Sequence, residues 1–165
     1  MTATPLTFDP IERAGELWNE RIGDDRAMRL ATSIMRVQQL VLAALDAAVK
    51  PYGITFARYE VLVLLSFSRT GSLPLSKVGE RLMVHPTSVT NLIDRLEAQG
   101  LVTRTVDAAD RRRVLASLTS DGRRVLRQAT AALTAIDFAV GTLDDTDQER
   151  AYELLRMLRS SDFGD

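Results

Sequence analysis

The chain has 165 residues, of which 45% are hydrophobic and 26% are charged, and its formal net charge is −1. These values are typical of one globular domain with a hydrophobic core, and they exclude a polycation that coats nucleic acid through its net charge. Because the chain contains no cysteine, disulfides, thiolate metal sites and thiol redox switches are also excluded.

The N-terminal segment predicts a flexible arm followed by a short amphipathic helix. Residues 1–10 contain two prolines and three threonines, and they lack the basic segment and apolar run of a signal peptide. No apolar run approaches the roughly 20 residues that span a bilayer, so we expect a cytoplasmic protein that binds no membrane. Gly23 is expected to end the helix that follows the arm. Apolar residues recur along it at helical spacing: Ile11, Ala14, Trp18 and Ile22.

Two further helices are predicted before the middle of the chain. The first covers about residues 25–50 and ends there because Pro51 cannot continue it. It is apolar on more than one side, which is typical of a helix that packs between two partners. The second helix covers residues 55–67, and a loop is expected over residues 68–72.

Residues 74–100 predict a helix-turn-helix. Two helices fit here, with a turn near Met83–His85 and with Ser76 capping the first helix. Pro86 suits the first turn of the second helix, and Gly100 suits the position just after its end. Six apolar residues are expected to form one buried cluster across the turn: Val78, Leu82, Val89, Leu92, Ile93 and Leu96.

The opposite face of the second helix predicts a contact with DNA. Its side chains are short and polar: Thr87, Ser88, Thr90, Asn91, Asp94 and Arg95. Asparagine can bond adenine, arginine can bond guanine, and serine or threonine can touch bases or phosphates, so this face suits a major groove. The alternative interpretation is an ordinary solvated helix face.

A β-hairpin with a basic loop is predicted after the helix-turn-helix. The segments 101–106 and 114–118 fit two short strands, and the loop between them contains DAADRRR. As a wing, this loop would place arginine beside the adjacent minor groove, where the negative potential is strong. The alternatives are a solubilising edge loop, or pairing of Arg111–Arg113 with Asp107 and Asp110.

Two long helices are predicted at the C-terminal end. The first is capped by residues 119–122 and ends at Gly141, and the second begins with a capping box of Thr146 and Glu149. The predicted fold is mainly α with a small β-hairpin: a winged helix-turn-helix lobe joined to a helical dimerisation region. The broad apolar surface of the long helices fits a two-fold dimer interface.

Four segments, in this order, resemble the multiple-antibiotic-resistance regulator (MarR) family of winged helix-turn-helix transcription factors: LSKVGERL, VHPTSVTNLIDRLEAQGLVTR, DAADRRR and LTSDGRR. The resemblance covers roughly residues 25–160. It implies one MarR-type domain over residues 11–165, with the DNA-binding lobe at 55–118 and dimerisation helices at 11–50 and 120–160. It also implies a homodimer that represses transcription from a pseudo-palindromic double-stranded DNA operator and is released by a small molecule.

The resemblance also implies site residues. Those expected to contact DNA are Ser76, Thr87, Ser88, Thr90, Asn91 and Arg95, with Arg111 or Arg112 in the minor groove. The tryptophan-bearing N-terminal helix is similar to the urate-responsive branch of the family, which implies an effector site at Trp18, Tyr59, Glu60 and Arg104.

Two positions depart from that branch. Glu60 stands where it has aspartate, and Leu92 stands where it has a second arginine. The effector class therefore stays open among aromatic acids, purines and acyl thioesters. In the alternative interpretation, Trp18 fastens its helix to the dimer core and Glu60 pairs with Arg58 or Arg29.

No motif supports an enzyme. The phosphate-binding, dinucleotide-binding, nucleophile-elbow and zinc-protease motifs are absent. His85 lies in the turn of the helix-turn-helix, with no nucleophile and orienting acid to make it a general base. We therefore expect no catalytic residue, cofactor or metal site. The rival to a DNA-binding regulator is a winged-helix module that binds only proteins.

Overall fold

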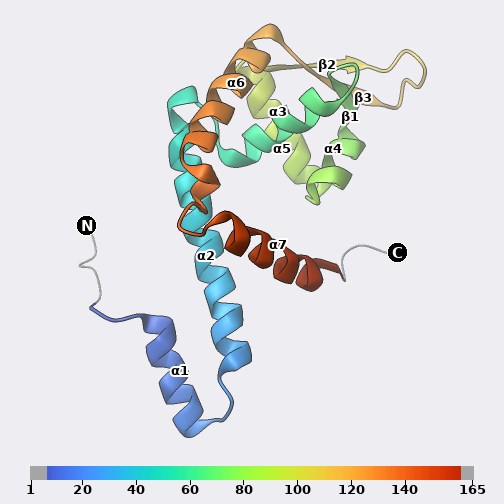
Figure 1. Cartoon of the computed structure of the whole chain (residues 1–165). Coiled ribbons are helices and arrows are strands. Elements are labelled where there is room, and N and C mark those ends of the chain that lie inside the picture. Colours follow the sequence, from blue (N-terminus) through green and yellow to red (C-terminus); the bar gives the residue numbers. More distant parts are fainter. Residues whose placement is uncertain (1–6, 161–165) are drawn as a thin grey trace. The chain divides into compact units, whose positions relative to one another are not determined.

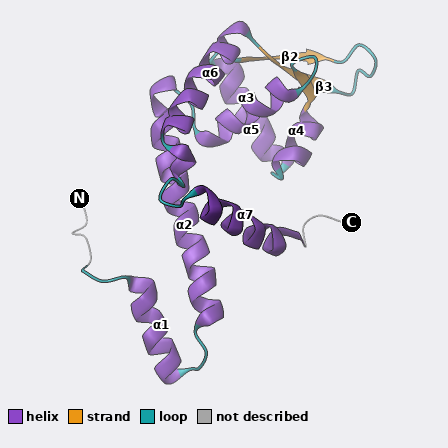
Figure 2. Ribbon diagram, in the orientation of Figure 1, coloured by secondary structure: helices purple, strands orange, loops and turns teal. Residues whose placement is uncertain are grey.

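The computed structural model describes residues 7–160 and is mainly helical, with one small antiparallel sheet (Figure 1, Figure 2). This architecture confirms the predicted fold class. The chain divides into two compact units, Met1–Ala43 and Ala44–Asp165. The expected flexible arm lies mostly outside the described residues, and its last residue, Pro10, already belongs to a helix.

The first unit contains α1 (Pro10–Arg21) and most of α2 (Arg26–Val49). Asp9 caps α1 by accepting a hydrogen bond from a backbone N–H of its first turn. The two helices approach closely at Gly15, where a Cβ atom would lie 2.5 Å from Cδ of Arg29. Both predicted helices are confirmed, to within a residue or two at their ends.

The second unit contains the rest of α2 and all later elements. These are η1 (Lys50–Tyr52), α3 (Phe56–Phe67), β1 (Ser72–Pro74), α4 (Leu75–Leu82), α5 (Pro86–Ala98), β2 (Val102–Val106), β3 (Val114–Leu118), α6 (Ser120–Ala135), η2 (Asp137–Ala139) and α7 (Asp145–Arg159). The predicted helix-turn-helix and hairpin are both present (Figure 2).

The hydrophobic core of the second unit centres on α3. Val61, Leu62 and Leu65 of this helix are fully buried, and each such leucine contributes about 1.5–3 kcal/mol of burial energy. The Tyr59 hydroxyl lies 3.1 Å from Oγ1 of Thr130 and so ties α3 to α6. Among residues 7–160, no single helix is long and apolar enough to cross a membrane. One pair of segments, Arg26–Tyr52 and Phe56–Phe67, passes that test only when combined, across a 73° bend.

The sheet has the order β1-β3-β2, and both pairs of strands are antiparallel. β1 was not predicted, because its first residue, Ser72, was assigned to a loop. A three-residue strand offers too little alternation to be recognised. It forms because Leu73 pairs with Ala116 of β3 and is buried there.

Two predicted helix caps are wrong. Ser76 lies inside the first turn of α4, whose N-cap position is Pro74 with no side-chain cap. The capping box of Thr146 and Glu149 is replaced by Asp144, whose Oδ1 accepts a hydrogen bond from the backbone N–H of Asp147 at 2.9 Å. In both places another residue precedes the predicted cap and starts the helix earlier.

The helix predicted to end at Gly141 ends earlier, at Ala135. Asp137, Phe138 and Ala139 have φ values of 47°, 48° and 63°, so three consecutive non-glycine residues adopt the left-handed conformation. The apolar spacing continues to Val140, but periodicity does not reveal a reversal of backbone handedness. A side chain of α7 also holds this turn, since Gln148 Nε2 donates to Asp137 Oδ2 at 3.0 Å.

Candidate nucleic-acid interface

The turn between α4 and α5 is built from local backbone features. Met83 adopts the left-handed conformation, with φ 54°, and ends α4. His85 then occupies the N-cap of α5, where its Nδ1 accepts a hydrogen bond from the backbone N–H of Thr87 at 3.3 Å. Gly79 permits the helices to meet closely, because a Cβ atom there would lie 3.0 Å from Cγ2 of Val89. His85 therefore acts as a helix cap, a role that the sequence did not predict for it.

The two predicted faces of α5 are confirmed, except that Leu82 and Leu92, both expected in the buried cluster, are half-buried. Val89, Ile93 and Leu96 are buried against the core, together with Val78 of α4. The polar residues all lie exposed: Thr87, Ser88, Thr90, Asn91, Asp94 and Arg95. Thr90 donates its hydroxyl to the Pro86 carbonyl at 3.2 Å. The outward face of α5 therefore presents hydrogen-bonding groups while its inward face fixes the helix.

Arg104 of β2 joins the hairpin to α5. Its Nη1 lies 2.7 Å from Asp94 Oδ1, and its Nε donates to Glu97 Oε2 at 2.8 Å. Its backbone N–H also donates to Glu97 Oε1 at 3.2 Å. The hydrogen bond from Arg104 lowers the pKa of Glu97, and the same bond raises the pKa of Arg104. Both acids of α5 therefore pair with the same guanidinium group, which offsets one of their two negative charges.

The loop between β2 and β3 extends beyond the two strands (Figure 1). Both of its aspartates form hydrogen bonds within the loop. The backbone N–H of Asp107 donates to the Arg113 carbonyl at 3.0 Å. Asp110 Oδ1 accepts the backbone N–H of Arg112 at 3.0 Å, and its carboxylate also lies 3.4 Å from Nε of Arg112 and 3.6 Å from Nε of Arg113. Arg111 forms no ion pair with any residue from 7 to 160.

A second site contains two of the predicted effector residues. Tyr59 and Glu60 of α3 line a hollow of about 410 Å³. Three of its other lining residues, Phe67, Leu82 and Phe138, were not predicted as site residues. Phe67 and Leu82 end their helices and Phe138 lies in the unpredicted turn, so no sequence pattern joins them.

The hollow does not include all the predicted effector residues. Arg104 is not among its lining residues, and Trp18, which is 37% exposed, belongs to the first unit. Glu60 is exposed, and partial desolvation by its surroundings raises the pKa of its carboxyl. Glu60 forms no ion pair within residues 7–160. Arg58 instead donates to the Gly53 carbonyl, so the predicted pairing of Glu60 with Arg58 does not occur. Arg29 pairs with Asp25 within the first unit.

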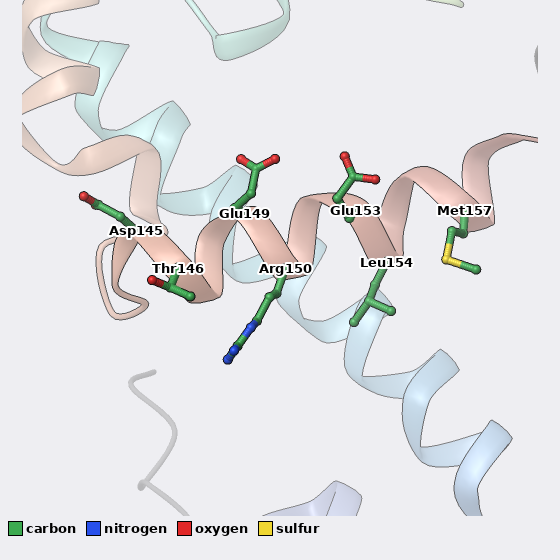
Figure 3. A pocket seen from close by; sticks show the side chains of 7 residues that line it. All are labelled: Asp145, Thr146, Glu149, Arg150, Glu153, Leu154 and Met157. Carbon is green, nitrogen blue, oxygen red and sulfur yellow. The ribbon is translucent and has the colours of Figure 1, made fainter.

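The last helix, α7, borders a shallow, open pocket with a volume of about 720 Å³ (Figure 3). Leu154 and Met157 form its apolar part, and Asp145, Glu149 and Glu153 supply acids around it. None of the α7 residues is buried. Although acids gather here, no group of side chains in the described part of the chain has the composition of a metal site.

Comparison with known proteins gives consistent matches. Residues 54–114 match the model of the MarR family. The HTH-type transcriptional repressor MdtR of Bacillus subtilis is 36% identical over 117 residues, which cover 66% of this chain and 74% of MdtR. The structure of Sco5413, a MarR family transcriptional regulator from Streptomyces coelicolor, is 51% identical with a TM-score of 0.78, over 85% of this chain and 99% of Sco5413. A mutant MarR from Escherichia coli complexed with operator DNA is 25% identical with a TM-score of 0.72, over 86% of this chain and 97% of that one.

Proposed function

The chain belongs to the MarR family of transcriptional regulators, and on this premise we propose that it represses transcription as a homodimer bound to a pseudo-palindromic DNA operator. The description of MdtR as a repressor and the operator complex of the similar MarR protein support this proposal. One observation carries the proposal: α5 exposes a face of hydrogen-bonding side chains, and the hairpin that follows it in sequence exposes the basic loop, which we call the wing.

The outward face of α5 suits the reading of bases. Asn91 and Arg95 are exposed and lie four residues apart, so both project from one side of the helix. Asparagine can pair with adenine and arginine with guanine, each through two hydrogen bonds. Thr87 and Ser88 lie in the first turn of α5, where backbone N–H groups favour phosphate. Ser76, exposed in the first turn of α4, is assigned a phosphate contact on the same grounds.

The wing supplies the positive charge that the whole chain lacks. Arg111 is exposed, and Arg112 has a side chain that is 94% exposed despite its contact with Asp110. Exposed ion pairs contribute only about 0–1 kcal/mol, so Asp110 orients Arg112 without holding it from DNA. Both arginines are therefore assigned to the minor groove beside the recognition helix.

A homodimer accounts for the apolar surface of the long helices. α7 exposes Tyr152, Leu154, Leu155, Met157 and Leu158. α2 exposes a further apolar set: Leu30, Met35, Val37, Leu40 and Leu42. Exposed apolar surface of this extent is typical of protein interfaces. A two-fold interface buries it once on each protomer and would place two α5 helices about 34–36 Å apart, one turn of DNA.

A small effector would act on this spacing. A ligand that binds more tightly to a conformation with another separation of the α5 helices lowers the population that fits the operator. Four residues were predicted for the effector site: Trp18, Tyr59, Glu60 and Arg104. The structure supports two of them, Tyr59 and Glu60, which line the same hollow.

The proposal is tested by titrating salt against binding to a duplex of random sequence. A DNA-binding dimer should lose affinity steeply between about 50 and 200 mM salt, because each phosphate contact releases counterions. A winged-helix module that binds only proteins should show no binding even at low salt, and this result would overturn the proposal.

A further inference from the structure

The hollow beside α3 is apolar except at one point. Its walls come from α3, the end of α4 and the turn η2, and comprise Val63, Leu64, Phe67, Leu82 and Phe138. Its polar groups belong to Tyr59 and Glu60. Tyr59 is buried and its hydroxyl is bonded to Thr130 at 3.1 Å. The Glu60 carboxyl is therefore the polar group left for a ligand.

Nothing in the described part of the chain balances the charge of this carboxyl. Glu60 forms no hydrogen bond or ion pair there, and no lysine, arginine or histidine is among the residues that line the hollow. Its nearest basic neighbour in sequence, Arg58, donates instead to the Gly53 carbonyl. Glu60 is exposed at the edge of the hollow, and a carboxylate that has no partner beside an apolar wall is stabilised by a cation that enters the site.

We propose that this hollow binds an organic cation with an apolar body, with Glu60 as its counter-ion, and that molecules of this class are the effector. This inference rests on the proposed function of a ligand-responsive regulator. A volume of about 410 Å³ holds a small organic molecule. Aromatic acids and acyl thioesters of coenzyme A are anionic, and they would meet an unpaired negative charge at the only free polar group.

The position of the hollow connects it to the DNA-binding elements. Leu82 is the last residue of α4, and the next residue, Met83, forms the left-handed turn that leads to α5. On the other side, Phe138 belongs to the left-handed turn between α6 and α7. A ligand that separates Leu82 from Phe138 therefore pushes on the helix-turn-helix and on the start of the proposed dimer helix together.

The test uses three probes that share one apolar body: 4-phenylbutylamine, 4-phenylbutanol and 4-phenylbutyrate. Binding to the full chain is measured by calorimetry at neutral pH, where the amine is a cation and the acid an anion. The amine is expected to bind more tightly than the alcohol by about tenfold, the size of one charge-assisted hydrogen bond, and the acid least tightly. Glu60→Gln should remove the advantage of the amine and leave the alcohol unchanged.

Glu12→Gln is the matched control, since Glu12 is an exposed acid of α1. It should leave all three affinities unchanged. The inference is overturned if the acid binds as tightly as the amine, if no probe binds, or if Glu60→Gln changes nothing. Binding of the wild-type protein to DNA is measured in parallel, without any probe. If the protein does not bind DNA, the proposed function is overturned. If it binds DNA but does not bind the amine, only this inference is overturned.

Discussion

In the wing, the three consecutive arginines Arg111–Arg113 differ in their contacts with Asp110. Asp110 contacts both Arg112 and Arg113, whereas Arg111 has no acidic partner in the described residues. The side chain of Arg113 is also less exposed, at 62% against 94% for Arg112. The sequence predicted pairing with the aspartates and contact with DNA as alternatives, and the structure is compatible with both at different arginines.

Arg111→Ala is expected to weaken operator binding nearly equally for all operator sequences and to lower the salt slope by about one, as loss of one backbone-type contact does. Arg113→Ala is the matched control and should have the smaller effect, because the side chain of Arg113 is less exposed than that of its neighbour Arg112. Fluorescence anisotropy at several salt concentrations measures both quantities. A larger loss from Arg113→Ala would contradict this assignment.

At the scale of elements, the helices with strong local signals were predictable and the irregular pieces were not. The helix predicted from residue 55 is capped by Thr55, and Thr119 caps α6 within the segment expected to do so. The two faces of α5 follow from its apolar spacing. β1 and η2 were missed, because a three-residue strand needs its partner and a left-handed turn leaves no apolar pattern. The hollow was only half predictable for the same reason, since Phe138 reaches it from η2.

The left-handed turn of η2 predicts a stabilising substitution. Ala139 has φ 63°, a conformation that costs an L-residue about 1–2 kcal/mol and glycine almost nothing. Ala139→Gly is expected to raise the free energy of unfolding by about 0.5–1 kcal/mol, after the entropy gained by the unfolded chain is subtracted. Ala131→Gly, in the interior of α6, should lower it by about 1 kcal/mol. Urea denaturation compares the two, and equal destabilisation would refute the turn geometry.

The Arg104 contacts predict a coupling between wing and recognition helix. Arg104→Gln leaves the charges of Asp94 and Glu97 uncompensated on the helix proposed to face DNA. Operator binding should therefore weaken through repulsion of phosphate. Adding Asp94→Asn to the same chain should restore part of the affinity, as a double-mutant cycle would show. If the two changes simply add, the contact does not act through charge.

At the scale of the whole molecule, the proposed function depends on a dimer. α7 carries no buried residue, and its exposed side chains include Leu154 and Leu158. The sequence predicted such an interface from the helix over residues 25–50, which is apolar on more than one side, and from the two C-terminal helices. The partner side of that interface lies on a second chain, so one sequence cannot specify which residues meet.

Replacing Leu154 and Leu158 together by lysine should shift the protein from dimer to monomer, since each buried leucine contributes about 1.5–3 kcal/mol. Glu149→Lys is the control on the same helix and should leave the dimer intact, because it changes a charge without removing apolar surface. Sedimentation velocity measures the two species. A dimer unaffected by both lysines would exclude α7 from the interface.

Recognition of DNA by α5 is tested most directly by selecting binding sites from a pool of random duplexes with the wild-type protein and with the Asn91→Ala and Arg95→Ala variants. The wild-type protein should enrich an inverted repeat whose half-site centres lie about 10–10.5 base pairs apart, one helical turn. Each α5 variant should enrich a changed half-site, since base contacts specify sequence. Failure to enrich any sequence, or the same half-site from all three proteins, would contradict recognition of DNA by α5.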